Sequence, residues 1–283
     1  MTKKYELSIK DVENNCFTAK LGVLMGAVFE QVGNREGKGS KFSVDKFTEE
    51  ELFFRNMYEL HMALFDCLKV IDTAIDFISM YNKKYYMRKK CIPFDKFALY
   101  HFDVFCHKVS TIKDLYFKII NIVYELNLNK NNISWKSIDN QRLKINNLDV
   151  FICLERFFNL CSDIEKKRHK SSHEGYINSS ALSDISLYLM VSDLQEKVPQ
   201  FTPSNPIYVK DSYIYRLQIK KAKKEFVNQL RGKRNAIFII TRYFLCSLEL
   251  QLEKLRINKI PDIKAVPIGD SHFCKCSECT STI

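Results

Sequence analysis

The stretch Thr48–Met80, with the sequence TEEELFFRNMYELHMALFDCLKVIDTAIDFISM, decides the fold. Thr48 and Glu51 have the spacing of a capping box, in which each side chain accepts a hydrogen bond from the backbone amide of the other. Apolar residues then recur at steps of three, four or five residues, as they do on one face of a helix. These residues are Leu52, Met57, Leu60, Leu64, Leu68, Ile71, Ile75 and Ile78. The pattern predicts a long helix.

Similar patterns predict helices over 93–126, 148–167, 181–191 and 207–256. Pro93 suits the first turn of the first of these helices. The run 21–29 is apolar but too short for periodicity to decide between helix and strand. With 8 Gly and 6 Pro in 283 residues, the composition favours long helices over a sandwich or barrel. We therefore expect an all-α bundle of long helices, extended by additional N- and C-terminal helices.

Three prolines, Pro199, Pro203 and Pro206, mark the strongest candidate boundary in the chain. A second boundary falls after a Gly-rich stretch near residue 40. The expected segments are an N-terminal extension and loop over 1–47, a helical core over 48–198, a basic helical extension over 199–262 and a Cys-containing tail over 263–283.

Charge and cysteine content limit the class of protein. The formal net charge is +11, which suits a polyanionic partner such as nucleic acid or simply a soluble basic surface. The 10 cysteines are mostly scattered singly and the N-terminus is polar, so free thiols in a reducing cytoplasm are expected. The longest apolar runs are too short to cross a bilayer, and we expect no membrane partner.

The segment from Arg168 to His173, with the sequence RHKSSH, combines two residue types that suit phosphate chemistry. Histidine titrates near neutral pH and can move protons, while arginine stabilises negative charge on phosphoryl oxygens. A pattern with Arg, then Asn, Asp or His directly after it, and His five residues after the Arg is expected by chance about 0.03 times in a chain of this composition. Here His169 occupies the position directly after Arg168. Ser171 and Glu174 have capping-box spacing, which predicts a helix break inside the motif.

This motif resembles the active-site signature of the HEPN superfamily, an Arg, a polar residue, three further residues and then His. The long helices before it look similar to a larger, helix-extended bacterial branch, and the resemblance is firmest over 93–191. It implies a HEPN-like helical bundle and a metal-independent endoribonuclease without a cofactor. In such an enzyme the ribose 2′-hydroxyl attacks the adjacent phosphorus and leaves a 2′,3′-cyclic phosphate.

The resemblance also implies roles for residues and partners. His173 would act as acid or base, Arg168 would stabilise the phosphate, and His169 would position its neighbours. Two protomers would pair so that both motifs line one cleft. Many family members act as toxins or in antiviral defence. A partner or activator protein is a further expectation. By analogy Asp114 and Asn121 would support the site. The alternative is a noncatalytic HEPN-like module for RNA binding or scaffolding.

Other polar clusters leave two interpretations open. Asp114, Lys118 and Asn121 share one helix face, which is either a solvent edge or the wall of a polar cleft. Basic residues that would hold RNA phosphates, or form a solvated helix face, are Lys170, Lys220, Lys221, Lys223, Lys224, Arg231, Lys233 and Arg234. The tail residues His272, Cys274, Cys276 and Cys279 could bind zinc, or else belong to a disordered terminus with exposed thiols. The resemblance implies that the catalytic site itself needs no metal.

Overall fold

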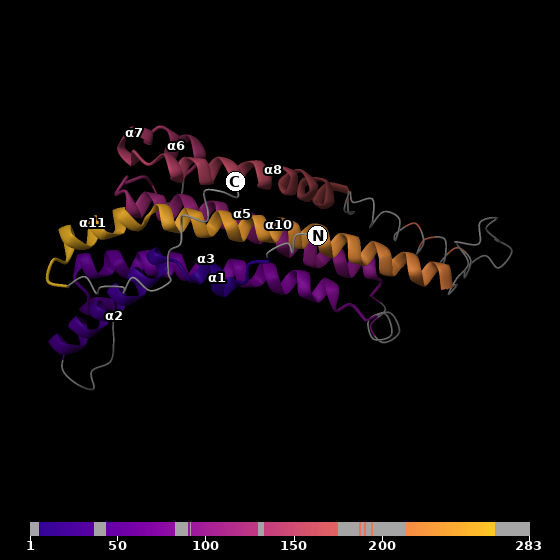
Figure 1. Ribbon diagram of the computed structural model, residues 1–283, viewed down its shortest axis with the longest axis horizontal. Coiled ribbons are helices and arrows are strands. Elements are labelled where there is room, and N and C mark those ends of the chain that lie inside the picture. Colours follow the sequence, from indigo (N-terminus) through magenta and orange to yellow (C-terminus); the bar gives the residue numbers. More distant parts are fainter. Residues whose placement is uncertain are drawn as a thin grey trace. The chain divides into compact units, whose positions relative to one another are not determined.

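The computed structural model describes residues 6–36, 44–82, 90, 92–129, 133–174, 187, 190, 194 and 213–263, apart from the side chains of 167–174, 213–216, 218 and 219. The described part of the chain is all-α and has no strand, as the sequence predicts (Figure 1). Its elements are α1 (Ile9–Glu13), α2 (Cys16–Glu36), the 3-10 turn η1 (Val44–Lys46), α3 (Glu49–Ser79), α5 (Phe94–Val123), α6 (Trp135–Asp139), α7 (Arg142–Ile145), α8 (Leu148–Glu174), α10 (Tyr213–Ser247) and α11 (Glu249–Lys259).

The chain divides into two compact units, and each unit draws on several segments. Unit 1 contains residues 1–68, 111–158 and 237–283, and unit 2 contains 69–110 and 159–236. The two sets of residues alternate along the chain, so that α3, α5, α8 and α10 each contribute residues to both units. The expected boundary at the three prolines lies outside the described residues.

Helix α3 begins with the predicted capping box. The Thr48 amide donates to Glu51 Oε2 at 2.8 Å, and the Glu51 amide donates to Thr48 Oγ1 at 3.2 Å. The Glu51 side chain is 2% exposed and also accepts two hydrogen bonds, at 2.7 and 2.6 Å, from the Arg35 guanidinium at the end of α2. Hydrogen bonding to Arg35 lowers the pKa of Glu51. The same carboxylate therefore caps α3 and ties it to α2.

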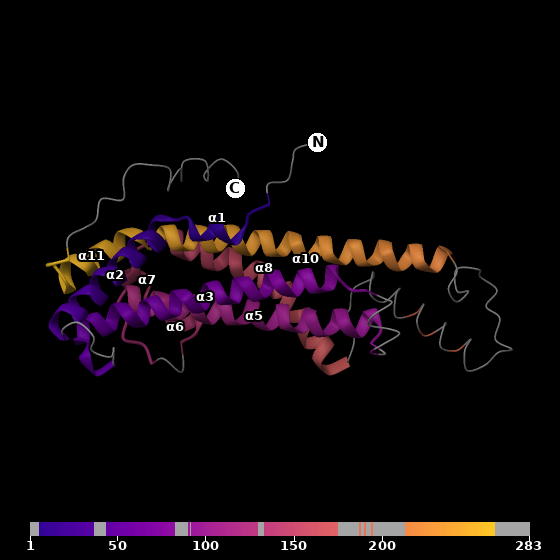
Figure 2. The same cartoon turned by 90° about the horizontal axis from the view of Figure 1, so that it is seen from below.

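The N-terminal segment is more helical than the sequence indicates. The undecided run 21–29 lies inside α2, which has 21 residues and continues to Glu36, past the expected start of the loop. Helix α2 contacts α11 (Figures 1 and 2). An ion pair of 2.6 Å between Lys20 and Glu249 links the two helices. The buried apolar residues of α2, which include Leu21, Leu24 and Val28, thus stabilise the run 21–29 as a helix, although local periodicity could not decide its structure.

A buried histidine connects α2 to α3. His61 is 4% exposed, and its Nε2 lies 2.9 Å from Thr18 Oγ1. Its ring lies among the aromatic rings of Phe17, Tyr58 and Phe65. Burial lowers the pKa of His61 to about 4, because the apolar surroundings disfavour the charged imidazolium. This histidine belongs to the core of unit 1.

The core of unit 1 contains a polar chain within an aromatic cluster. Tyr116 Oη lies 2.7 Å from Thr241 Oγ1, which donates to the Ile237 carbonyl at 2.8 Å, so the Tyr116 hydroxyl donates to Thr241. The Tyr116 ring packs against Phe157 at 4.9 Å and Phe244 at 4.2 Å between ring centroids. Because none of these aromatic side chains is exposed, α5, α8 and α10 meet here in a water-free contact.

Asn147 holds together the ends of the same three helices within unit 1. Its Nδ2 donates to Tyr124 Oη at 2.9 Å, just beyond α5, and to the Ser247 carbonyl at 2.8 Å, at the end of α10. Its Oδ1 accepts from the Val150 amide at 3.4 Å in the first turn of α8. One side chain therefore caps α8 and fixes two neighbouring helix ends.

The segment between α5 and α8 contains two short helices that are not among the helices predicted from the sequence. Helices α6 and α7 lie there, and Ser134 caps α6 through a capping box with Ser137. Asn146, with φ 42°, ends α7 in the left-handed conformation, which Asn tolerates better than most residues. Trp135 packs edge-on against Phe151 and Phe158.

Unit 2 has its own aromatic core and a partly buried ion pair. Phe102 packs against Phe226 with ring centroids 5.9 Å apart, and both side chains are 3% exposed. Arg234 on α10 pairs with Asp72 on α3 at 2.8 Å, and the Arg234 side chain is 8% exposed. His101 stacks on Phe77 with ring centroids 5.2 Å apart, and burial lowers its pKa.

We expect Tyr116→Phe to lower the free energy of unfolding by about 1 to 2 kcal/mol, because the buried Thr241 hydroxyl would lose its donor. The measurement is urea denaturation followed by the fluorescence of Trp135, the one tryptophan in the chain, which belongs to the same unit. Tyr100→Phe is the matched control, since this side chain is 66% exposed, and it should change stability by less than about 0.5 kcal/mol. Equal effects of the two variants would contradict the role of the buried hydroxyl.

We also expect acid to weaken unit 1 through His61. Its folded pKa of about 4 lies below the ordinary histidine value of 6.5, so its contribution to the free energy of unfolding is complete above pH 6.5 and is lost as the pH falls towards 4. The loss between pH 7 and pH 4 should be on the order of 3 kcal/mol. Urea midpoints measured across this range should decline in the wild type and much less in His61→Phe. A decline of the same size in the variant would assign the effect to other groups.

Candidate functional site

The predicted catalytic motif lies in the last part of α8, within unit 2. The expected helix break inside the motif is wrong, because α8 continues past its predicted end at 167 and through Glu174. The capping-box spacing of Ser171 and Glu174 therefore does not start a new helix. A residue pair with this spacing is also compatible with a helix interior, which explains the incorrect prediction.

The continuous helix determines which motif positions share a face. Arg168 and His173 are five residues apart, so their positions differ by about 140° around the helix axis. His169 and His173 are four residues apart and occupy neighbouring positions on one face. The motif side chains, together with Lys170, lie outside the described part of the structure, and their contacts remain predictions.

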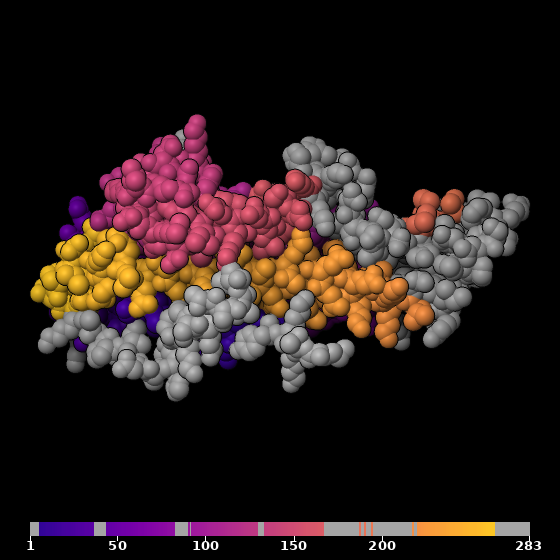
Figure 3. Space-filling model, turned by 45° about the horizontal axis from the view of Figure 1, so that its top comes forward, coloured from indigo at the N-terminus to yellow at the C-terminus, as the bar shows by residue number. Residues whose placement is uncertain are grey.

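Part of the predicted basic surface lies on α10 in the same unit. Lys220, Lys221 and Lys224 are exposed, and α10 is visible in orange on the molecular surface (Figure 3). Lys221 lies 4.0 Å from Glu225, a weak exposed pair. Lys220 and Lys224 are one helical turn apart, so they can contact neighbouring phosphates of an extended strand.

Other cations on the predicted list are used inside unit 2. The pair between Arg234 and Asp72 removes Arg234 from the surface. Lys223 donates to the Tyr81 carbonyl at 3.2 Å, and burial lowers the pKa of its ammonium group. Arg231 lies 3.8 Å from Asp76, and Lys233 is half-buried. The basic surface of α10 is therefore smaller than the sequence suggests.

The two residues expected to support catalysis lie in unit 1 and have different environments. Asp114 is exposed. Asn121 is 7% exposed, and its carboxamide donates to the Leu128 carbonyl at 3.2 Å and accepts from the Leu128 amide at 3.0 Å. Asn121 thus holds the loop after α5, in which Glu125 and Asn127 have positive φ angles of 47° and 56°. This structural role accounts for its polarity without a ligand.

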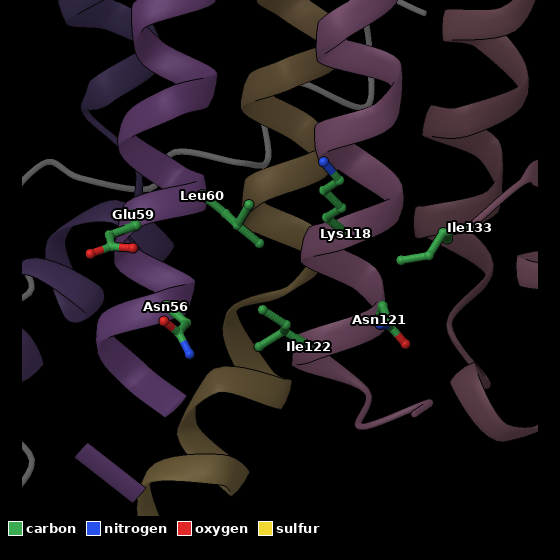
Figure 4. Close-up of a pocket in the computed structure, with 7 residues that line it drawn as sticks. All are labelled: Asn56, Glu59, Leu60, Lys118, Asn121, Ile122 and Ile133. Atoms are coloured by element: carbon green, nitrogen blue, oxygen red, sulfur yellow. The ribbon is translucent and has the colours of Figure 1, made fainter. Parts of the chain in front are cut away.

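A pocket of about 330 Å³ opens between α3 and α5 in unit 1 (Figure 4). Its lining residues are Asn56, Glu59, Leu60, Lys118, Asn121, Ile122 and Ile133. A second hollow of about 350 Å³ shares Asn56, Asn121 and Ile122 with it and extends towards Phe53 and Glu125. The polar stripe of Lys118 and Asn121 therefore lines a cleft, whereas Asp114 does not take part.

Sequence reasoning singled out Lys118 and Asn121 but missed the facing residues of the pocket. Leu60 was assigned to the apolar stripe of α3, and Asn56 carried no motif. A signal was present, because Asn56 and Leu60 are one helical turn apart, so a polar residue stands beside the edge of the apolar stripe. The partner helix was not predictable from that spacing.

Neither a metal centre nor a membrane span is found among the described residues. No group of three or more His, Cys, Asp or Glu side chains there could hold a metal ion. The predicted tail ligands His272, Cys274, Cys276 and Cys279 lie outside the described residues. No described helix has a stretch long and apolar enough to cross a bilayer.

Comparison with protein-family models, with curated proteins and with solved structures gave no match. The resemblance of the RHKSSH segment to the HEPN signature therefore remains a prediction from the residues at 168–173.

Proposed function

We propose that this protein is a metal-independent endoribonuclease of the HEPN type that acts as a homodimer. The observation that carries the proposal is the segment from Arg168 to His173, in which Arg, a polar residue and a final His have the spacing of the HEPN signature. Its location in the same unit as the exposed lysines of α10 supports RNA as the substrate.

The reaction requires two proton transfers and charge stabilisation. The ribose 2′-oxygen forms a bond to phosphorus and loses its proton, while the bond from phosphorus to the 5′-oxygen breaks and that oxygen gains a proton. His173 moves protons in these steps, because imidazole titrates near neutral pH. Arg168 stabilises the negative charge that develops on the phosphoryl oxygens. The products are a 2′,3′-cyclic phosphate and a free 5′-hydroxyl.

The uninterrupted helix supports a site shared between two chains. Because Arg168 and His173 are about 140° apart around α8, a phosphate at His173 of one protomer would be reached more readily by Arg168 of a second protomer. His169, one turn before His173, suits a positioning role through a hydrogen bond to the imidazole or to the phosphate. Such an enzyme would serve as a toxin or in antiviral defence and would act in the cytoplasm.

We expect His173→Ala and Arg168→Ala each to abolish RNA cleavage in the presence of EDTA. A shared site further predicts that the two inactive variants restore activity when they are mixed under subunit exchange. Random pairing gives heterodimers in half of the dimers, and each heterodimer has one intact site, so activity should reach about one quarter of the wild type. The measurement is the amount of 2′,3′-cyclic phosphate product.

The controls separate a shared site from a site within one chain. Each inactive variant, taken alone through the same subunit-exchange procedure, should give no product. Absence of restoration in a mixture that has exchanged subunits would contradict the shared site, and cleavage by His173→Ala alone would contradict the nuclease assignment.

A second candidate function is a noncatalytic RNA-binding or scaffolding module. The exposed row of Lys220, Lys221 and Lys224 favours it, because these cations can hold phosphates whether or not the motif is catalytic. Salt-sensitive RNA binding without cyclic-phosphate products, unchanged by Arg168→Ala, would select this function over the nuclease.

In either case we expect the double variant Lys220→Ala and Lys224→Ala to weaken binding of single-stranded RNA. The slope of log K against log salt should decrease by about 1.4, from two lost phosphate contacts at about 0.7 each. The matched control is Lys10→Ala with Lys136→Ala, two exposed lysines on other helices, which removes the same charge and should leave the slope unchanged. Equal slopes for the two double variants would place the RNA elsewhere on the protein.

A further inference from the structure

The pocket between α3 and α5 in unit 1 has an apolar lining from three segments. In Figure 4, Leu60 points from α3 towards α5, and Ile122 points from α5 towards α3. Ile133, just before α6, also points towards α5. These branched side chains are half-buried and form walls that suit the faces of a ring or another compact apolar group.

The charges around this pocket leave one cation uncompensated. Glu59 pairs with Arg55 at 2.7 Å and points away from α5 (Figure 4). In the adjoining hollow, Glu125 pairs with Lys259 at 2.7 Å. Lys118 has no ion-pair partner within the part of the chain that the structure describes. The pocket is therefore complementary to an anion.

The two carboxamides of the pocket differ in their hydrogen bonds. Asn121 uses both its donor and its acceptor on the backbone of Leu128. Asn56 lines both hollows, and its carboxamide has no hydrogen-bond partner within the described residues. A free carboxamide offers one acceptor and two donors side by side, which match a ligand edge that carries an adjacent donor and acceptor, as nucleobases do.

We propose that this pocket binds a small organic anion with an apolar ring face and a hydrogen-bonding edge, the chemistry of a mononucleotide. Lys118 holds the phosphate, Asn56 holds the edge of the base, and the base packs against Leu60 and Ile122 (Figure 4). The volume of about 330 Å³ lies within the usual range of small-molecule sites, and the adjoining hollow gives room for the sugar. This ligand site is separate from the proposed nuclease motif, which belongs to unit 2.

The experiment measures binding by isothermal titration calorimetry with the full chain. The probes are the four ribonucleoside 5′-monophosphates, ribose 5-phosphate as a head group without a base, and octanoate as an anion without a hydrogen-bonding edge. At least one nucleotide should bind at least about tenfold more tightly than ribose 5-phosphate and octanoate. Binding of octanoate as tight as that of every nucleotide, or no binding by any probe, would overturn the proposal.

Two variants assign the binding to this pocket. Lys118→Gln should weaken nucleotide binding by about tenfold, since a charge-assisted hydrogen bond is lost. Asn56→Leu keeps a similar size, and it should weaken nucleotide binding and strengthen octanoate binding. The matched control is Lys113→Gln on the same helix, which does not line the pocket and should leave binding unchanged.

The outcomes also separate this inference from the nuclease proposal. Nucleotide binding that is equally strong in Lys118→Gln and Lys113→Gln would place the ligand elsewhere and overturn the inference, whatever the RNA cleavage result. The calorimetric experiment measures nucleotide binding and not RNA cleavage. Cleavage of RNA by His173→Ala would therefore contradict the nuclease proposal and leave the nucleotide-binding result unaffected.

Discussion

The hydrogen-bonded chain from Tyr116 through Thr241 to the Ile237 carbonyl is the constraint on which unit 1 depends. A hydroxyl buried without a partner costs free energy, so α5 and α10 satisfy it at one relative translation along their axes. The surrounding rings of Phe157 and Phe244 are fully buried. The same contact positions the part of α5 that carries Lys118 and Asn121 against α10 within unit 1.

Local signals were sufficient to predict much of the fold. Helix α3 was correctly predicted because its capping box and its apolar stripe both consist of residues a few positions apart in the sequence. Both hydrogen bonds of the capping box are confirmed. The contacts that join the helices could not be predicted in this way. Asn147 reaches Ser247 across 100 residues, and the two ends of that hydrogen bond carry no matching sequence signal. Helices α6 and α7 were missed because five- and four-residue helices are too short for periodicity.

The candidate site shows how burial separates residues that look alike in sequence. Arg234 and Lys224 belong to two basic runs of the same helix, yet Arg234 pairs with Asp72 within unit 2 while Lys224 remains exposed. The Asp72 that neutralises Arg234 lies on another helix, so counting charges along α10 could not reveal it. Asn121 and Asn56 differ in the same way, because the loop after α5 occupies the first carboxamide and leaves the second without a described partner. Potential ligand contacts are thus defined by the polar groups that the fold itself does not use.

The continuity of α8 bears directly on how the Arg168–His173 motif could act. A helix break would have let one chain bring both residues to one phosphate, but it would have left the amides of a new helix start in need of hydrogen-bond partners. The continuous helix avoids that cost, and it holds Arg168 and His173 on different faces. A single helix of this kind has His173 on one face and Arg168 on another. If the reaction needs both groups at one phosphate, two such helices that meet could supply them. The helical geometry is thus compatible with the homodimer that we propose from the resemblance in the motif.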